Sequence, residues 1–379
     1  MCVPKFWLRR RIDTCYLIIA SDCNFRCRYC FFGGNFEKGL PHGELMQEDL
    51  AKRGIRFFGM HALRTVEQYG ETLNIEPSVV FYGGEPLMNP RCLRRSIEYI
   101  RKLEKTGGMP KQTHVSVNTN GSLLTKHWAD FFVQQNVEVD VSIDGNSEIN
   151  DVNRVYTNGS GTFTDIMRGL GYLRNAGTKT CISCTITEAN VNRLPEVLNW
   201  FVDELGVDEI GFNPVLNSKK YQAPGDDFPQ RLARALIDCY IIARERGVYE
   251  SRIMRKVRPF VEGTIYDRDC CGCGRQIVIT PAGDIGVCHG YTGTKRYFVP
   301  FTDDLDLNAH PYWLEWVQRS PLHMPECENC EALGYCGGGC AYNADIEQGS
   351  IWKIDKRFCI HSIMTLHWLI EDLYAQTIQ

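Results

Sequence analysis

The chain has 379 residues, of which 44% are hydrophobic and 23% charged, and its formal net charge is −4. This composition is ordinary for a globular protein and excludes a disordered or fibrous chain, and the length suits two domains or one large α/β unit with an addition. Because the sequence has no block of like charge, it predicts no nucleic-acid partner.

The first predicted strand covers residues 14–20. Three arginines, Arg9 to Arg11, precede it, so the region superficially resembles the start of a targeting segment. The apolar run that follows has only six residues, which is shorter than a secretory signal and far below the roughly 20 residues of a membrane helix. We therefore expect a buried strand, no membrane partner and a cytoplasmic protein.

Short β-branched runs alternate with helical patterns up to residue 213. Six strands are predicted, at residues 14–20, 78–82, 114–118, 138–143, 180–187 and 209–213, with helices between them at 46–69, 91–103 and 191–205. Repeated βα units of this kind build a parallel sheet. Six units are too few to close an eight-stranded barrel. The predicted fold class is therefore α/β, with a partial (β/α)6 barrel over residues 1–215.

The alternation stops after Pro214. A helical bridging region is predicted for residues 216–265, including a helix at 229–246, and cysteine, glycine and turn residues dominate from Asp269 onward. A hairpin is predicted at 276–280 and 285–288, and an amphipathic helix at 358–374. Residues 266–379 are thus predicted to form a small, cysteine-rich α+β domain.

Cysteine is unusually abundant, with 18 residues in the chain. In a reducing compartment, clustered cysteines bind metal more often than they form disulfides. Cys23, Cys27 and Cys30 follow the first strand. A closed zinc or iron–sulfur site uses four protein ligands, so three leave one position free for a substrate. The triplet indicates either a four-iron cluster that chelates S-adenosylmethionine or a zinc knuckle with its fourth ligand elsewhere.

Small polar motifs end the next three predicted strands. They are Tyr82-Gly83-Gly84-Glu85-Pro86, Asn118-Thr119-Asn120-Gly121 and Ser142-Ile143-Asp144-Gly145. Glycines let a backbone approach a ligand closely, and a carboxylate can receive an ammonium group. Each motif alone is as typical of a turn as of a site. Three at successive strand ends indicate a ligand site, because βα architectures bind ligands at that edge.

The cysteine triplet, with an aromatic residue before its last cysteine, and the three strand-end motifs together resemble the radical S-adenosylmethionine superfamily over roughly residues 14–213. The resemblance implies a [4Fe-4S] cluster held by Cys23, Cys27 and Cys30, with Tyr29 against the adenine of S-adenosylmethionine. It further implies a set of cofactor-binding residues: Gly83, Gly84 and Glu85 for the methionyl amino group, Asn120, Ser142 and Asp144 for the ribose and carboxylate region, and Arg154 as a further carboxylate partner.

The C-terminal cysteines have a spacing of their own. It reads Cys327-x2-Cys330-x5-Cys336-x3-Cys340 with Cys359 beyond, preceded by Cys273-x9-Gly283-x4-Cys288. This resembles the SPASM domain, a two-cluster extension of radical enzymes that modify peptides and proteins. The resemblance implies a first auxiliary cluster on Cys273, Cys288 and Cys340 with Cys270 or Cys271, and a second on Cys327, Cys330, Cys336 and Cys359. Three [4Fe-4S] clusters are therefore expected in all.

His289 follows Cys288 where the anaerobic sulfatase-maturing members of this family carry an aspartate that serves as a base. A histidine with a near-neutral pKa could take a proton from a radical or thiol substrate, or only donate a hydrogen bond to it, or it could be a polar residue at a strand end. His289 is the candidate catalytic residue, and the departure puts the sulfatase reaction in doubt.

The expected function is maturation of a ribosomally made precursor peptide, through hydrogen abstraction followed by cross-linking, oxidation or fragmentation, with an external electron donor. Only about thirteen residues precede the first strand, so we expect either a separate leader-binding protein or direct reading of the substrate. One alternative is oxidation of a protein cysteine or serine to formylglycine. An alternative of another class is a non-catalytic, zinc-stapled binding module.

Overall fold

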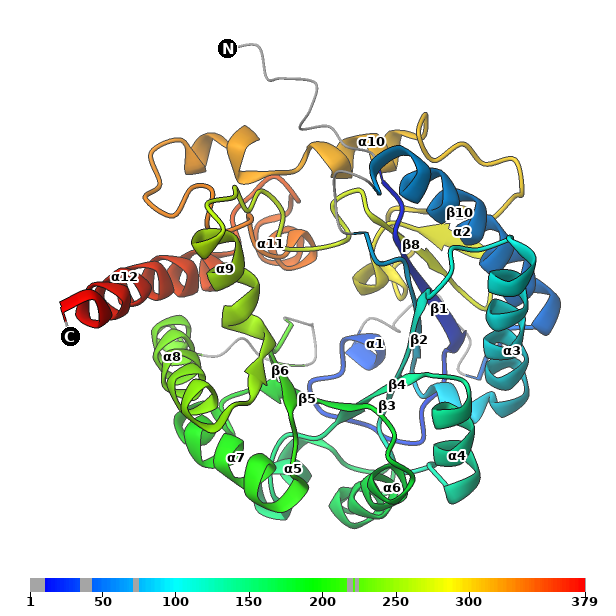
Figure 1. The fold of residues 1–379 in the computed structure, drawn as a ribbon, viewed down its shortest axis with the longest axis horizontal. Coiled ribbons are helices and arrows are strands. Elements are labelled where there is room, and N and C mark those ends of the chain that lie inside the picture. Colours follow the sequence, from blue (N-terminus) through cyan, green and yellow to red (C-terminus); the bar gives the residue numbers. More distant parts are fainter. Residues whose placement is uncertain (1–10, 35–42, 71–74, 217–220, 222–224, 379) are drawn as a thin grey trace.

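The computed structural model describes residues 11–34, 43–70, 75–216, 221 and 225–378. One curved sheet of ten strands, in the order β10-β9-β8-β1-β2-β3-β4-β5-β6-β7, organises these residues (Figure 1). Its first six strands in sequence are β1 Thr14–Ala20, β2 Ser78–Gly83, β3 His114–Thr119, β4 Glu138–Ser142, β5 Thr180–Ile186 and β6 Glu209–Pro214. They pair in parallel in chain order, which confirms the predicted α/β barrel.

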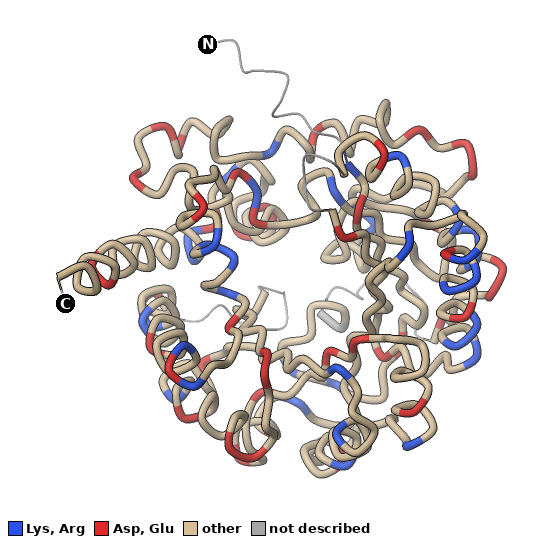
Figure 2. The backbone as a smooth tube through the Cα atoms, viewed as in Figure 1, with Lys and Arg blue, Asp and Glu red and all other residues tan. Residues whose placement is uncertain are grey.

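Helices cover the outside of the curved sheet (Figure 1). They are α2 Glu48–Tyr69, α3 Pro90–Thr106, α4 Lys126–Gln134, α5 Ser147–Asn153, α6 Phe163–Ala176, α7 Leu194–Trp200 and α8 Phe228–Arg246. The core lies between the two layers, where Leu17, Phe81 and Val139 of the sheet and Phe58 and Phe132 of the helices are almost fully buried. Basic and acidic residues are interspersed along these outer helices (Figure 2).

The inner face of the sheet is reachable by solvent. On β4, Val139 and Val141 are buried, whereas Glu138, Asp140 and Ser142 keep partial exposure. Strands β2 and β6 begin with the same alternation. Because successive side chains of a strand point to opposite faces, the buried set faces the helices and the partly exposed set faces the interior. The ends of these strands can therefore present side chains to a ligand inside the barrel.

The second region of the chain continues the same sheet. The predicted hairpin is β8 Gln276–Ile279 and β9 Asp284–Gly286, and β10 Phe298–Pro300 extends it. Strand β8 also pairs in parallel with β1, in the register Thr14↔Gln276, and Arg275 forms an ion pair with Asp13 at 2.9 Å. The cysteine-rich region is thus joined to the barrel through its first strand. The sequence predicted the two regions separately and did not predict this pairing.

The other strand and α-helices lie mostly in the C-terminal third. They are the short α1 Phe31–Gly34, β7 Tyr249–Glu250 at the edge beside β6, and the helices α9 Ser251–Val261, α10 Pro311–Gln318, α11 Ala341–Gln348 and α12 Lys356–Ile378. Helix α12 corresponds to the predicted helix at 358–374 and packs against α8. Within the described part of the chain, no helix combines the length and apolar character needed to cross a membrane.

Candidate active site and cysteine groups

The loop that follows β1 carries the three N-terminal cysteines. Burial raises the pKa of Cys23 to about 12, and the negative charges of Glu85, Cys27 and Cys30 add to this. Burial likewise raises the pKa of Cys27 to about 11, with a contribution from Cys30 and an opposing one from Arg154. The structure thus brings the triplet together. Metal binding here would be coupled to loss of the thiol protons, because the thiolate is the ligand form.

The glycine turn after β2 packs against this loop. A Cβ atom on Gly83 would lie 2.2 Å from the carbonyl oxygen of Ala20, and one on Gly84 would lie 2.1 Å from that of Asp22. The backbone N–H groups of Gly84 and Glu85 donate to these same two carbonyls, each at 2.9 Å. No side chain fits in this contact, so the two glycines fix the position of the loop relative to the strand ends.

The side chain of Glu85 is fully buried and joins β2 to β3. Its Oε1 accepts hydrogen bonds from Leu87 N at 2.9 Å and Thr119 Oγ1 at 2.7 Å, and its Oε2 accepts from Asn120 N at 2.7 Å. Burial raises the pKa of Glu85, and these hydrogen bonds oppose the rise. An ionised carboxylate has about four acceptor sites, so one remains for a further donor such as an ammonium group.

Asn120 ties the end of β3 to the cysteine loop. Its Nδ2 donates to Asn24 Oδ1 at 2.8 Å and lies 3.7 Å from Cys23 Sγ. Asn24 in turn donates to Ser122 Oγ at 2.9 Å. The predicted site residue Asn120 therefore lies beside the cysteine triplet. Ser142, at the end of β4, is partly exposed on the inner face.

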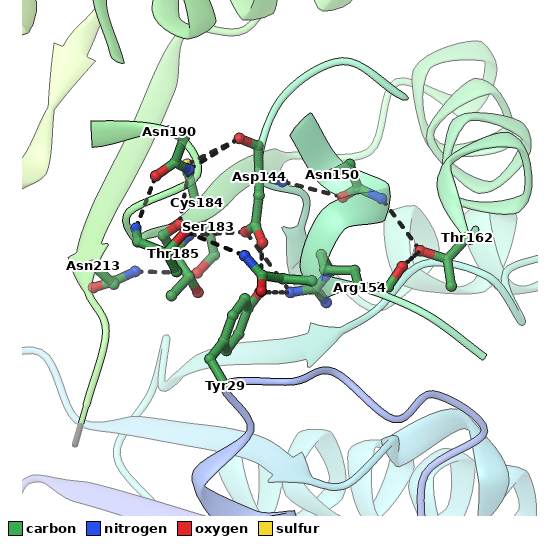
Figure 3. A network of polar contacts seen from close by, with 12 residues as sticks. Tyr29, Asp144, Asn150, Arg154, Thr162, Ser183, Cys184, Thr185, Asn190 and Asn213 are labelled. Carbon is green, nitrogen blue, oxygen red and sulfur yellow. Dashed lines mark hydrogen bonds and ion pairs between the residues drawn. The ribbon is translucent and has the colours of Figure 1, made fainter. Parts of the chain in front are cut away.

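Tyr29, Asp144 and Arg154 form a buried network (Figure 3). Tyr29 Oη donates to Asp144 Oδ2 at 2.6 Å, and Arg154 Nη1 donates to Tyr29 Oη at 2.7 Å. Arg154 Nη1 also lies 3.9 Å from Asp144 Oδ1, and its Nε is buried without a hydrogen-bond partner among the described residues. The positive charge of Arg154 lowers the pKa of nearby Cys27 against the dominant effect of burial. A free, buried donor beside the triplet suits an anionic group such as a carboxylate.

Residues that sequence reasoning missed hold Asp144 in place (Figure 3). Thr185 N donates to Asp144 Oδ1 at 3.0 Å, Asn190 Nδ2 donates to the Asp144 carbonyl at 3.3 Å, and Asp144 N donates to Asn150 Oδ1 at 3.3 Å. The network links β4 to α5 and β5. No sequence motif marks these positions, because ordinary turn and helix residues provide the contacts.

His289 lies in an aromatic stack on the inner side of β1 and β2. Its ring centroid is 4.8 Å from that of Tyr16 in a stacked arrangement, 5.3 Å from that of Tyr82 and 6.0 Å from that of Phe31. Burial lowers the pKa of His289 to about 4, below the near-neutral value typical of histidine. Its buried Nδ1 has no hydrogen-bond partner among the described residues.

Cys270 and Cys271 have different surroundings. Burial raises the pKa of Cys270 well above its ordinary value, and the charges of Cys273, Cys288, Cys340 and Cys271 add to the rise. The charge of Cys271 acts on Arg275 and Arg11, and both thiols act on Tyr16. These surroundings favour Cys270 as the partner of the other three cysteines.

The second group contains Cys327, Cys330, Cys336 and Cys359. Burial raises the pKa of Cys359 to about 12, followed by the charges of Cys336 and Cys327. Within the ranges that the structure describes, no three His, Cys, Asp or Glu side chains are close enough to share a single metal ion. A four-iron cluster has a different requirement, since each thiolate binds its own iron, and sets of four cysteines supply that donor type.

Comparisons with known proteins identify relatives of the chain. The family model described as Radical SAM superfamily matches residues 17–201. The chain is 24% identical over 376 residues to the radical SAM cyclopropyl synthase TigE of Paramaledivibacter caminithermalis, covering 95% of this chain and 74% of that protein. It is 25% identical over 350 residues to a cysteine-type anaerobic sulfatase-maturating enzyme of Clostridium novyi, covering 86% and 87% of the two chains.

Two solved structures share the fold. Native anSMEcpe with bound AdoMet superposes with a TM-score of 0.76 at 20% identity, covering 97% of this chain and 100% of that one. SuiB of Streptococcus suis bound to S-adenosylmethionine superposes with a TM-score of 0.65 at 17% identity, covering 92% and 77%. The non-catalytic binding module is therefore wrong as an interpretation of this protein: the chain is an enzyme, and its residues 17–201 form a radical SAM domain.

Proposed function

We propose that this enzyme is a maturase that abstracts a hydrogen atom from a ribosomally synthesised peptide. The observation that carries the proposal is the gathering of Cys23, Cys27 and Cys30 beside the buried network of Tyr29, Asp144 and Arg154. Three thiolates leave one iron of a [4Fe-4S] cluster without a protein ligand. The network next to them offers the charged groups that the amino acid part of S-adenosylmethionine requires.

The residues of the chain fit the cofactor at named atoms. The partnerless Nε of Arg154 would donate to the methionyl carboxylate, and the remaining acceptor site of Glu85 would receive the methionyl ammonium group. Gly83 and Gly84 hold the backbone against the cysteine loop where that group would lie. When bound, the cluster supplies one electron to the sulfonium and thereby releases a 5′-deoxyadenosyl radical.

Two further [4Fe-4S] clusters would be held by the C-terminal cysteines. Cys270, Cys273, Cys288 and Cys340 would hold the first, and Cys327, Cys330, Cys336 and Cys359 would hold the second. Both groups consist only of thiols, the ligand type that iron–sulfur clusters select. The clusters would accept the electron that is released when the substrate radical is oxidised. An external donor would supply the electron that starts each turnover.

The peptides bound in structures of related proteins support a peptide substrate. TigE is a cyclopropyl synthase, and solved structures show SuiB bound to the precursor peptide SuiA and anSMEcpe bound to the Cp18Cys peptide. We propose a precursor peptide here too, leading to a cross-link, an oxidation or a backbone fragmentation. Formylglycine formation is less well supported, because His289 stands where sulfatase-maturing enzymes place an aspartate.

The test uses anaerobically reconstituted enzyme and synthetic precursor peptides from the chromosomal neighbourhood, each deuterated at one residue type. The proposal predicts transfer of deuterium into 5′-deoxyadenosine from one labelled residue and a peptide whose mass has changed. A sulfatase peptide with cysteine or serine at the reactive position is assayed in parallel. Turnover of that peptide alone, with formylglycine as product, would replace the precursor-peptide proposal by the sulfatase reaction.

A further inference from the structure

Strand β6 has a neighbouring strand along only the first part of its outer edge. Strand β7 pairs with it at Glu209 and Ile210, so Phe212 and Asn213 lie beyond this pairing. Arg252, in the first turn of α9, occupies the place beside them. Its Nε donates to the Phe212 carbonyl at 2.9 Å, and its Nη2 donates to Asn213 Oδ1 at 2.7 Å. Both acceptors are neutral, so they satisfy N–H groups of the guanidinium but do not balance its charge.

Asn213 connects this arginine to the inner face of the barrel. Its Nδ2 donates to Ser183 Oγ at 3.2 Å. Ser183 is partly exposed on β5 and lies between two buried residues, so it faces the interior. Figure 3 shows Ser183 and Asn213 beside Thr185 and Asp144. The guanidinium of Arg252 therefore reaches the inner face close to the network that holds Asp144.

No carboxylate in the described ranges forms an ion pair with Arg252, although its side chain is buried. Glu250 uses its carboxylate to cap α9, with Oε1 accepting from Arg252 N at 2.7 Å and Oε2 from Ile253 N at 2.8 Å. Burial raises the pKa of Glu250 to about 7, so at neutral pH it carries only part of a negative charge. A buried cation without a full counter-charge is unfavourable, because the protein interior replaces its hydration poorly.

Other basic residues lie on α9, beside the end of β6 (Figure 2). Arg255 Nη1 lies 3.9 Å from Asp269 Oδ2, and Lys256 Nζ lies 3.8 Å from Asp269 Oδ1. Two cations thus share Asp269, and Arg252 adds a third positive charge. Fixed positive charge beside a ligand site attracts anionic groups. The Nη1 group of Arg252, which has no hydrogen-bond partner in the part of the chain that the structure describes, is free to donate to such an anion.

We propose that Arg252 binds a carboxylate of the peptide substrate, so that the enzyme prefers a precursor with an acidic residue near the position that is modified. The inference rests on the proposed function and deepens it by naming the chemistry of the substrate. A charge-assisted hydrogen bond from a guanidinium to a carboxylate is stronger than one to a neutral oxygen. Arg252 determines specificity in this account and takes no part in hydrogen abstraction.

S-adenosylmethionine offers a second carboxylate, and the two sources predict different effects. The proposed function places the methionyl carboxylate at Nε of Arg154, which is buried and partnerless. If Arg252 binds the peptide, its loss changes the KM of the peptide and leaves the Kd of S-adenosylmethionine unchanged. If Arg252 binds the cofactor, its loss raises that Kd instead.

The experiment uses the reconstituted full-length enzyme and the precursor peptide that transfers deuterium to 5′-deoxyadenosine. Each acidic residue of the peptide is replaced singly by its amide, Asp by Asn or Glu by Gln. With the parent enzyme, one replacement should raise KM about tenfold, as the loss of one charged hydrogen bond implies, and should leave kcat nearly unchanged. With Arg252→Met, the acidic and amide peptides should have the same KM. With Arg252→Lys, part of the preference should remain.

Two further variants complete the test. Arg258→Met removes an exposed cation of the same helix and should keep the preference of the parent. Asn213→Asp keeps Arg252 and puts a carboxylate at the atom that now accepts from its Nη2 at 2.7 Å. This internal counter-charge should abolish the preference for the acidic peptide without removal of the arginine. Asn213→Asp therefore decides the question if Arg252→Met does not fold.

Three results would overturn the inference and leave the proposed function intact. They are an unchanged preference for the acidic peptide in Arg252→Met and Asn213→Asp, a raised Kd of S-adenosylmethionine in Arg252→Met with no change in peptide preference, and turnover of a precursor without acidic residues. Turnover of the sulfatase peptide alone would reject the proposed function instead. The same amide replacements made in that peptide then decide whether Arg252 selects a carboxylate.

Discussion

Tyr29 and Asp144, 115 residues apart in the chain, are joined by a hydrogen bond of 2.6 Å between the tyrosine hydroxyl and Asp144 Oδ2. The bond connects the cysteine loop to the end of β4, and Arg154 donates to the same hydroxyl at 2.7 Å. The hydroxyl of Tyr29 thus contacts both the carboxylate of Asp144 and the guanidinium of Arg154, and it fixes their positions beside the cysteine triplet.

Replacing Tyr29 by Phe should destabilise the protein and weaken the binding of S-adenosylmethionine. The change leaves a buried carboxylate oxygen and a buried guanidinium N–H without a partner, at a cost of about 1–3 kcal/mol in the free energy of unfolding. Urea unfolding and equilibrium binding of S-adenosylmethionine measure the two effects. Tyr156→Phe is the matched control, since its hydroxyl donates to Asp165 at 2.5 Å in a less buried position. Equal losses of stability and of S-adenosylmethionine binding in both variants would show that Tyr29 has no special role in the site.

Replacing Glu85 by Gln should destabilise the fold even without a ligand. A carboxylate accepts all three hydrogen bonds at this position, whereas an amide would direct its own N–H groups at the donors Leu87 N, Thr119 Oγ1 or Asn120 N. The expected cost is about 1–3 kcal/mol, measured by urea unfolding. Glu67→Gln, at an exposed position of α2, should change nothing measurable. A stability like that of the parent would mean that Glu85 does not link the two strand ends.

Asp140, on the inner face of β4, predicts a pH dependence of stability. Burial raises its pKa to about 7, the charges of Glu138 and Glu209 add to the rise, and His114 and a hydrogen bond with Cys181 oppose it. The folded state therefore holds the proton of Asp140 more tightly than the unfolded state does. The stabilisation that this proton gives to the folded state is complete below the unfolded pKa near 4, and it is lost as the pH rises to about 7.

Asp140→Asn should therefore gain stability relative to the parent as the pH rises. Between about pH 5.5 and about pH 8, the difference in the free energy of unfolding should change in favour of the variant by on the order of 2 kcal/mol. Urea titrations at both pH values measure it. The exposed Asp130→Asn should follow the parent at both pH values. A difference between Asp140→Asn and the parent that stays constant with pH would show that Asp140 titrates normally.

Cys270 and Cys271 should differ in iron binding. The charges of Cys273, Cys288 and Cys340 raise the pKa of Cys270, whereas the charge of Cys271 acts on Arg275 and Arg11. Cys270→Ala should lose about four irons per chain, as one missing four-iron cluster implies, while Cys271→Ala keeps the parent content. Anaerobic reconstitution followed by iron analysis decides between the two, and the reverse result would move the ligand to Cys271.

Much of the barrel could be predicted from the sequence because local patterns encode it. Alternating residues such as Val139 and Asp140 mark a strand with one buried and one accessible face, and the turns after β2, β3 and β4 carry the recognisable motifs. The structure confirms the arrangement of the strands. The grouping of the C-terminal cysteines follows from the resemblance of their spacing to the SPASM domain and stays a prediction.

What the sequence could not supply depends on contacts between distant segments. Pairing of β8 with β1 joins residues more than 250 positions apart, and no local pattern specifies it. The lowered pKa of His289 follows from burial against Tyr16 and Tyr82, and the motif around Cys288 gives no sign of these contacts. The choice between Cys270 and Cys271 likewise depends on the neighbours that each thiol has in the fold.

The most direct test of the central claim is reductive cleavage of S-adenosylmethionine by the anaerobically reconstituted enzyme, followed by chromatography for 5′-deoxyadenosine. The account predicts about twelve irons per chain, as three four-iron clusters imply, and 5′-deoxyadenosine from the wild type but not from Cys27→Ala. Bound zinc without cleavage, or equal product from Cys27→Ala, would contradict the assignment of the radical chemistry to the triplet Cys23, Cys27 and Cys30.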